Sequence, residues 1–167
     1  MLKLHLGCGR DHKTSWVNID RERGDLHIDL GSKLLSDFDD CSVDYIYAQH
    51  FIEHLSFKDA VALLKDCKRV LRGHMRLSTP NIEEAVDCYL HRRLERFKEI
   101  TFKAPAQIIA WFYDGHEHVY DWEDLKRLLI EAGFSDIVRV RRNESQIEEL
   151  RNLETRPDYN DLIVEVR

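Results

Sequence analysis

The chain has 167 residues, with 25 Lys and Arg against 31 Asp and Glu and a formal net charge of −6. This length fits one domain, since domains typically hold about 100–200 residues. The acidic balance argues against nucleic-acid or membrane-surface binding, which needs clustered Lys and Arg. No apolar run reaches the ~18 residues of a membrane span. The four cysteines contain no C-x-x-C pair, which is typical of thiols in a reducing cytosol. We therefore expect a single cytoplasmic domain over residues 1–167.

Short apolar runs alternate with turn residues over the first 80 positions. We expect strands over residues 2–6, 16–19, 26–28 and 43–48, because short runs rich in β-branched and aromatic side chains suit strands. A helix over 56–72 follows, in which Ser56 and Asp59 form a capping-box pattern and Gly73 stands where a C-terminal cap belongs. Residues 75–79 predict a fifth strand.

The second half of the chain is mainly helical. Apolar residues at helical spacing predict a helix from 81 to about 98, and a short helix starts near Pro105. Another helix runs from its N-cap Asp121 to Ala132, with Gly133 at its end. Strands over 138–140 and 162–166 complete the pattern. Strands separated by helices predict a mostly parallel sheet that is covered on both faces.

A glycine turn directly after the first strand is the strongest local signal. Gly7 and Gly9 allow the backbone to turn sharply and to approach a ligand at the carboxyl edge of the sheet. Asp20 and Asp29 end the next two strands, and a carboxylate there can accept hydrogen bonds from a ribose or lie beside an adenine ring. The third glycine of the dinucleotide fingerprint is missing, which disfavours NAD or FAD. On spacing alone, a simple turn and two strand-end caps explain these residues equally well.

Several motifs in chain order resemble class I S-adenosylmethionine-dependent methyltransferases, in particular a small Rossmann-like subgroup. The segments that carry the resemblance are Leu4-His5-Leu6-Gly7-Cys8-Gly9, Trp16-Val17-Asn18-Ile19-Asp20, Ser42-Val43-Asp44-Tyr45-Ile46-Tyr47, His50-Phe51-Ile52-Glu53-His54-Leu55, Arg69-Val70-Leu71-Arg72, Arg76-Leu77-Ser78-Thr79-Pro80-Asn81 and Glu131-Ala132-Gly133-Phe134. Together they cover roughly the whole chain.

The resemblance implies a Rossmann-like three-layer α/β/α sandwich with a mostly parallel seven-stranded sheet. In it the last strand would lie antiparallel beside the fifth. It further implies S-adenosylmethionine as cofactor, with residues 81–113 as a helical lid over the acceptor pocket. The residues that it places at the cofactor are Gly7, Cys8, Gly9, Asp20, Asp29, Leu30 and His50. Among these, Asp20 would bind the ribose hydroxyls, and Asp29 with the Leu30 backbone would bracket adenine.

The sequence departs from the family pattern at three points. Ser15 replaces the glycine that usually precedes the tryptophan, and Gly9 lies too close to Asp20 for a full crossover helix. The turn after the long helix, Gly73-His74-Met75, is shorter than usual. The first two departures concern the methionine end of the cofactor site, and the third lies away from it.

His50-Phe51-Ile52-Glu53-His54 also matches H-x-x-E-H, a zinc-ligand pattern of metalloproteases. That pattern needs one long helix through the motif, whereas here a strand precedes it and Ser56 begins the next helix only after it. We therefore expect no metal, with a zinc-dependent hydrolase as one alternative and a non-catalytic S-adenosylmethionine-binding module as another. The candidate bases for methyl transfer are His50, His116 and His118.

The methyl acceptor has no signature in the sequence. The acidic charge favours a small molecule or a glycan over nucleic acid, and we expect no membrane partner.

Overall fold

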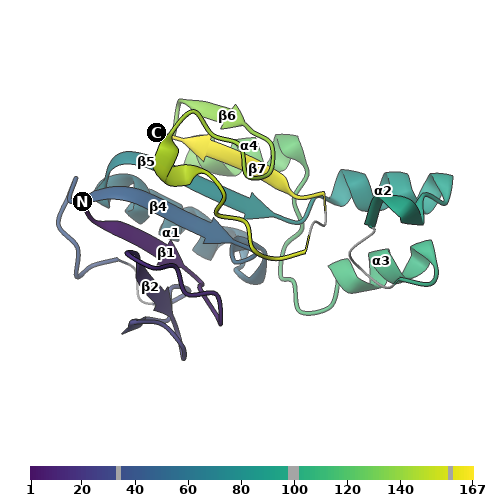
Figure 1. Cartoon of the computed structure of the whole chain (residues 1–167), viewed down its shortest axis with the longest axis horizontal. Coiled ribbons are helices and arrows are strands. Elements are labelled where there is room, and N and C mark those ends of the chain that lie inside the picture. The colour runs from purple at the N-terminus through teal and green to yellow at the C-terminus, as the bar shows by residue number, and fades with distance from the viewer. Residues whose placement is uncertain (33–34, 98–101, 158–159) are drawn as a thin grey trace.

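One seven-stranded sheet runs through the molecule (Figure 1). The computed structural model describes residues 1–32, 35–97, 102–157 and 160–167. The strands are β1 (Lys3–Leu6), β2 (Val17–Asp20), β3 (Leu26–His27), β4 (Val43–Gln49), β5 (Leu71–Thr79), β6 (Ile137–Arg139) and β7 (Leu162–Val166), in the order β3-β2-β1-β4-β5-β7-β6. Only β7 is antiparallel to its neighbours β5 and β6. The predicted Rossmann-like α/β fold with a mostly parallel sheet is confirmed.

Two helices, α1 (Phe57–Val70) and α4 (Trp122–Glu131), pack on one face of the sheet. Each begins where the sequence predicts, because the side chains of Ser56 and Asp121 accept hydrogen bonds from backbone N–H groups in the first turn. Their apolar stripes meet the strand residues that point to this face. That main core includes Leu4, Leu6, Ile46, Ala48, Leu64, Leu77, Leu128 and Val164.

The opposite face of the sheet is covered by a loop instead of α-helices. Residues between β6 and β7, with the short 3₁₀ helix η3 (Glu148–Leu150), lie over it, in front of the sheet in Figure 1. Leu150 and Leu153 of this segment pack with Trp16 and Tyr47 in a separate small cluster. The short connection between β1 and β2 explains the difference from the predicted second helical layer, since it contains no crossover helix.

A buried arginine holds this covering loop to the sheet. Arg76 of β5 is fully buried, and all five of its N–H donors are used. Nε and Nη2 donate to the two carboxylate oxygens of Glu154, at 2.6 and 3.1 Å, and Nη1 donates to Glu165 at 2.6 Å. The remaining donors reach the backbone oxygens of Arg141 and Glu144. This fork joins the loop to two strands.

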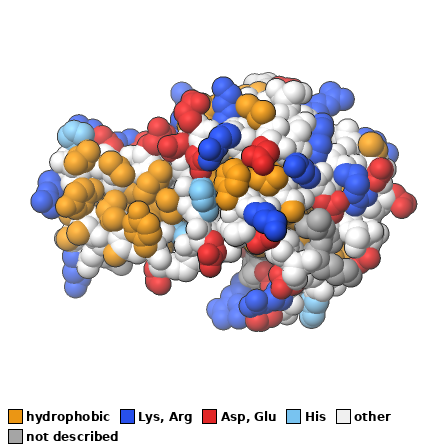
Figure 2. Space-filling view, turned by 180° about the vertical axis from the view of Figure 1, so that it is seen from behind, with side chains coloured by type: hydrophobic (Ala, Val, Ile, Leu, Met, Phe, Trp, Pro, Cys, Tyr) orange, Lys and Arg blue, Asp and Glu red, His pale blue; other side chains and the backbone are white. Residues whose placement is uncertain are grey.

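The helices α2 (Ile82–His91) and α3 (Pro105–Phe112), with the 3₁₀ helix η2 (Leu94–Phe97), form a lobe beyond the end of β5. The lobe has its own core, which includes Cys88, Ile108 and Phe112. Figure 2 shows hydrophobic side chains gathered on its surface, and Tyr89 and Leu90 are among the exposed ones. Residues 98–101 of the predicted lid lie outside the described residues. No described helix is both long and apolar enough to cross a membrane.

Two predicted helix ends are wrong. The helix predicted to continue to about residue 98 ends at His91, because Arg92 adopts a left-handed conformation (φ 59°) and η2 follows. Gly73 does not cap α1, since β5 begins directly at Leu71. Gly73 lies within β5 instead, where an added Cβ would come within 2.1 Å of the backbone oxygen of Asp44. The glycine therefore allows a close approach of two strands at the irregular register between β4 and β5.

Replacing Arg76 by Leu should lower the free energy of unfolding by about 3–5 kcal/mol, because two buried carboxylates would lose their partner. Arg72→Leu on the same strand is the control. Its ion pair with Asp44 is exposed, so we expect a loss below about 1 kcal/mol. Urea titrations of the three proteins measure both values, and equal losses would show that the buried fork does not hold the loop.

The second prediction concerns the stability of the protein in mild acid. Burial, reinforced by the charge of Lys13, lowers the pKa of His5 from 6.5 to about 4. Between these pH values the unfolded chain binds a proton that the folded protein does not, so stability falls as the pH falls, by up to about 3 kcal/mol. His5→Gln, which can still bond to Asn18, should flatten the pH dependence of the melting temperature from 6.5 to 4. A variant with the same slope as the wild type would contradict this assignment.

Candidate functional site

A pocket of about 420 Å³ opens at the carboxyl ends of β1 and β2. Turns that follow β1, β2, β3 and β4 surround it, as expected for the edge at which open α/β sheets bind ligands. Its volume lies within the range of small-molecule sites. The residues that line it are Gly7, Gly9, Asp20, Arg21, Glu22, Arg23, Ile28, Asp29, Leu30, Gly31, Phe51, His54 and Leu55.

The glycine turn forms one wall of this pocket. Gly7 and Gly9 have φ values of 61° and 55°, the left-handed region that favours glycine. A Cβ on Gly7 would lie 2.3 Å from the ring of Phe51. The missing side chain thus makes room for Phe51, an aromatic wall that the sequence analysis did not single out.

The Asp20 carboxylate joins this turn to the next. Its Oδ2 accepts a hydrogen bond from the Gly9 N–H at 3.1 Å, and its Oδ1 accepts from the N–H groups of Glu22 and Arg23 at 2.9 and 3.2 Å. Partial burial acts to raise the pKa of Asp20, but these backbone hydrogen bonds outweigh it, so the pKa lies below its usual value. The group is therefore an anion at neutral pH, held at the pocket by three backbone donors.

Asp29 and Leu30 also line the pocket, whereas Cys8 does not. Asp29 is exposed, and its Oδ1 accepts from the Gly31 N–H at 3.2 Å. The side chain of Leu30 belongs to the main core, so Leu30 can offer its backbone to a ligand. Cys8 is buried beneath the turn, and burial raises the pKa of its thiol to about 11. A neutral, buried thiol is a poor nucleophile.

His50 is buried behind the pocket and does not line it. Its φ of 51° is unusual for a non-glycine residue. The ring contacts two acids: Nε2 lies 2.9 Å from Asp161 Oδ2, and Nδ1 lies 3.6 Å from Glu53 Oε1. Ser78 donates to the same Asp161 oxygen. His50 is thus part of a buried polar network between β4 and β7.

The H-x-x-E-H string does not lie on one long helix. Ile52–His54 forms the short 3₁₀ helix η1, so His50 and His54 do not share a helix face. Glu53 is 1% exposed and accepts from the Thr79 hydroxyl through Oε2 at 3.1 Å. Burial raises its pKa, against the attraction of the neighbouring histidines. The geometry of a helical zinc protease is therefore not present in this segment.

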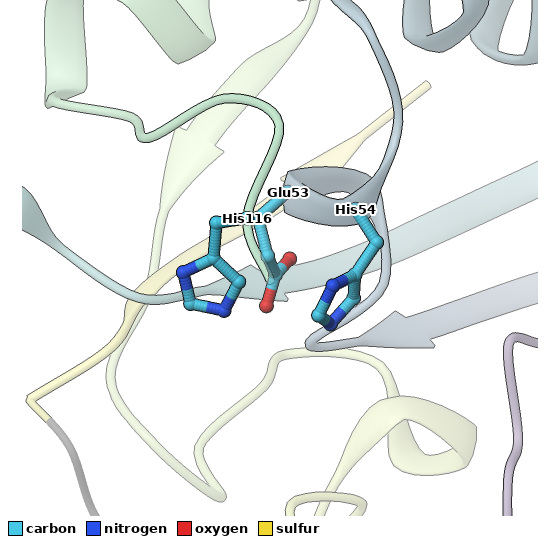
Figure 3. A group of neighbouring side chains, drawn as sticks. All are labelled: Glu53, His54 and His116. Atoms are coloured by element: carbon cyan, nitrogen blue, oxygen red, sulfur yellow. The ribbon is translucent and has the colours of Figure 1, made fainter. Parts of the chain in front are cut away.

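Glu53 and His54 are instead joined by His116 (Figure 3). One ligand atom from each of these side chains lies within 4.8 Å of the other two. The turn that carries His116 is held to η1 by backbone hydrogen bonds. The backbone carbonyl oxygen of Glu53 accepts from the N–H groups of Glu117 and His118 at 2.9 and 3.1 Å. His118 itself pairs with Asp124 of α4 and is not a member of this group. The ring of His116 contacts that of His54, which lines the pocket, with ring centroids 5.0 Å apart.

The structure thus brings together Gly7, Gly9, Asp20, Asp29 and Leu30, and it leaves Cys8, His50, His116 and His118 outside the lining of the pocket. The sequence analysis missed Phe51, and it missed the combination of Glu53 and His54 with His116. Residues Gly115-His116-Glu117-His118 form a polar stretch in the sequence, but no spacing rule connects them with a motif some 61 residues earlier.

No protein-family model matches the chain, and no curated protein sequence is significantly similar to it. Solved structures do match. They include an S-adenosylmethionine-dependent methyltransferase from Archaeoglobus fulgidus (16% identity, TM-score 0.61, covering 98% of this chain and 84% of that one). A possible histamine N-methyltransferase from Thermotoga maritima matches at 18% identity and TM-score 0.56, over 99% of this chain and 81% of that one.

A third match is an S-adenosylmethionine-dependent methyltransferase from Methanosarcina mazei (19% identity, TM-score 0.55, covering 98% of this chain and 89% of that one). At these identities the similarity concerns the fold and not the activity or the substrate. The chain has the fold of the class I S-adenosylmethionine-dependent methyltransferases.

Proposed function

We propose that the protein is an S-adenosylmethionine-dependent methyltransferase. The observation that carries this proposal is the pocket at the carboxyl edge of the sheet, in which the glycine turn, Asp20 and Asp29 face one space. In a sheet of this topology, that edge is where a nucleoside binds. When bound, the cofactor supplies an electrophilic methyl group on a sulfonium. The residues of the chain have to hold and orient the two reactants.

Asp20 is suited to bind the ribose. A carboxylate offers about four lone-pair sites, and three are occupied by the N–H groups of Gly9, Glu22 and Arg23. One site remains for a ribose hydroxyl, and a second hydroxyl would share an oxygen with one of these donors. Because the three bonds already orient the carboxylate, it needs little reorganisation when a ligand binds.

Asp29 and the backbone of Leu30 would bracket the adenine, and Phe51 offers an apolar surface in the same pocket. Cys8 would contribute only through its backbone, because its thiol is buried. His50 would act indirectly, by fixing the turn after β4 through Asp161.

The acceptor would bind between the pocket and the lobe of α2 and α3. The lobe follows the end of β5, so it can cover the same edge of the sheet (Figure 1). Methyl transfer from a sulfonium is an in-line displacement, so much of the rate comes from positioning. If the acceptor must lose a proton, His116 is the best placed of the three candidate histidines, beside His54 at the pocket. A small molecule or a glycan remains the favoured class of acceptor.

Titration with S-adenosylmethionine tests the first part of this proposal. At about 100 times its dissociation constant the ligand should stabilise the protein by about 2.7 kcal/mol, seen as a rise in melting temperature. Labelled methyl from the same compound, incubated with fractionated cell extract, should appear in one acceptor fraction. Binding without any methyl transfer would favour a non-catalytic binding module. The absence of binding at millimolar ligand would overturn both the methyltransferase and the binding-module hypotheses.

A further prediction separates ligand binding by Asp20 from its structural role. Asp20→Ala should weaken cofactor binding at least about tenfold, because one charge-assisted hydrogen bond is worth roughly 1.5–3 kcal/mol. It should also lower stability by about 1–2 kcal/mol, since three backbone donors lose their acceptor.

The matched control is Asp25→Ala. Asp25 also accepts a backbone hydrogen bond, from the Asn18 N–H, but it does not line the pocket. The Asp25→Ala variant should be less stable than the wild type but should bind the cofactor with the same affinity. If the two variants bind the cofactor equally well, Asp20 is only a turn cap.

A further inference from the structure

We propose that Glu53, His54 and His116 bind a divalent transition-metal ion. The two imidazoles lie on either side of the Glu53 carboxylate (Figure 3), and their ligand atoms lie within 4.8 Å of one another. Around one ion with metal–ligand distances of about 2.0–2.2 Å, two ligand atoms are separated by at most ~4.4 Å. Small side-chain rotations therefore suffice to close the site. This proposal does not depend on methyl transfer.

The hydrogen bonds of the two histidines leave one nitrogen of each ring available to a metal. His54 Nδ1 lies 2.8 Å from the backbone oxygen of Gly115, and His116 Nδ1 lies 2.7 Å from that of Phe112. A carbonyl oxygen only accepts, so each Nδ1 carries the proton, and Nε2 of each neutral ring retains its lone pair. A backbone carbonyl that holds the second ring nitrogen is the usual support of a metal-binding histidine.

The carboxylate supplies an independent observation. Glu53 is 1% exposed, and its Oε1 has no hydrogen-bond partner among the described residues. The Nδ1 atom of His50 lies 3.6 Å from this oxygen, beyond hydrogen-bond distance. A buried carboxylate oxygen without a partner is costly, and a bound cation is one of the few groups that would satisfy it.

The site is preorganised and open. The Thr79 hydroxyl donates to the other carboxylate oxygen of Glu53. The backbone N–H groups of residues 117 and 118 donate to the backbone carbonyl oxygen of Glu53, and these bonds hold the His116 turn in place. His54 is exposed and lines the cofactor pocket, so an ion can enter from solvent. Three protein ligands leave at least one position for water or for an oxygen of a bound molecule. Two imidazoles and one carboxylate favour Zn²⁺, Fe²⁺, Co²⁺ or Mn²⁺ over Mg²⁺ or Ca²⁺.

Titration of the full chain, free of any histidine tag, with Co²⁺ and Zn²⁺ tests the proposal. We expect one ion per chain, a visible Co²⁺ absorption spectrum, and a melting temperature that rises with metal concentration. Proton NMR of the Co²⁺ form should show two exchangeable, strongly shifted resonances, one from each Nδ1–H that is held by a carbonyl. This readout uses the unaltered protein and so does not depend on how any variant folds. The absence of stoichiometric binding at millimolar metal, or of the two shifted resonances, would overturn the proposal.

Substitutions then assign the ligands. His54→Gln, His116→Gln and Glu53→Gln should each weaken Co²⁺ binding at least about tenfold. His91→Gln is the matched control, since His91 is half exposed on α2 and distant from the site, and it should bind metal like the wild type. Circular dichroism confirms that each variant is folded. Folded ligand variants that bind Co²⁺ as tightly as the control would overturn the proposal. A parallel titration with S-adenosylmethionine separates this outcome from a failure of the proposed function.

Discussion

The guanidinium of Arg76 is the interaction on which the second face of the sheet depends. In a doubly wound fold helices usually cover both faces of the sheet, but here the connection between β1 and β2 is too short for one. The loop between β6 and β7 takes that place, and a loop brings backbone polar groups to a buried position. Arg76 satisfies two of these carbonyls and two buried carboxylates at once. The hydrogen bonds of this guanidinium thus hold the covering loop to the sheet, whereas apolar side chains of α1 and α4 hold the helices to the other face.

The anchored loop extends to the candidate site. Just after Glu154, the Thr155 hydroxyl donates to Asp11 at 2.6 Å, and its N–H donates to Gln49 at 3.3 Å. Asp11 belongs to the turn after β1, and Gln49 ends β4. The fork therefore also fixes two of the strand ends around the pocket. A change at Arg76 would reach the pocket through these contacts, although none of the five hydrogen bonds of Arg76 goes to a residue that lines the pocket.

A second junction joins the sheet to the helical lobe. The backbone oxygen of Glu53 accepts hydrogen bonds from two N–H groups of the segment between α3 and α4. The backbone oxygen of Gly115 in turn lies at hydrogen-bond distance from Nδ1 of His54. These bonds hold the turn that follows α3 against η1, next to the pocket. Binding of a ligand or an ion there would be linked to the position of the lobe, because the same few residues serve both.

The sequence by itself determined the elements whose signals are local. Short apolar runs marked all seven strands, and the side-chain caps Ser56 and Asp121 marked the starts of two helices, because these signals involve residues a few positions apart. The glycine turn and Asp20 were predicted to lie together because consecutive parallel strands end at one edge, and both line the same pocket. Only the tertiary structure decided the role of Gly73, which depends on a contact with Asp44 across two strands. It alone decided that His116 groups with Glu53 and His54, whereas His50 lies between Glu53 and Asp161. That grouping arises from backbone hydrogen bonds between distant segments, which leave no periodicity in the chain.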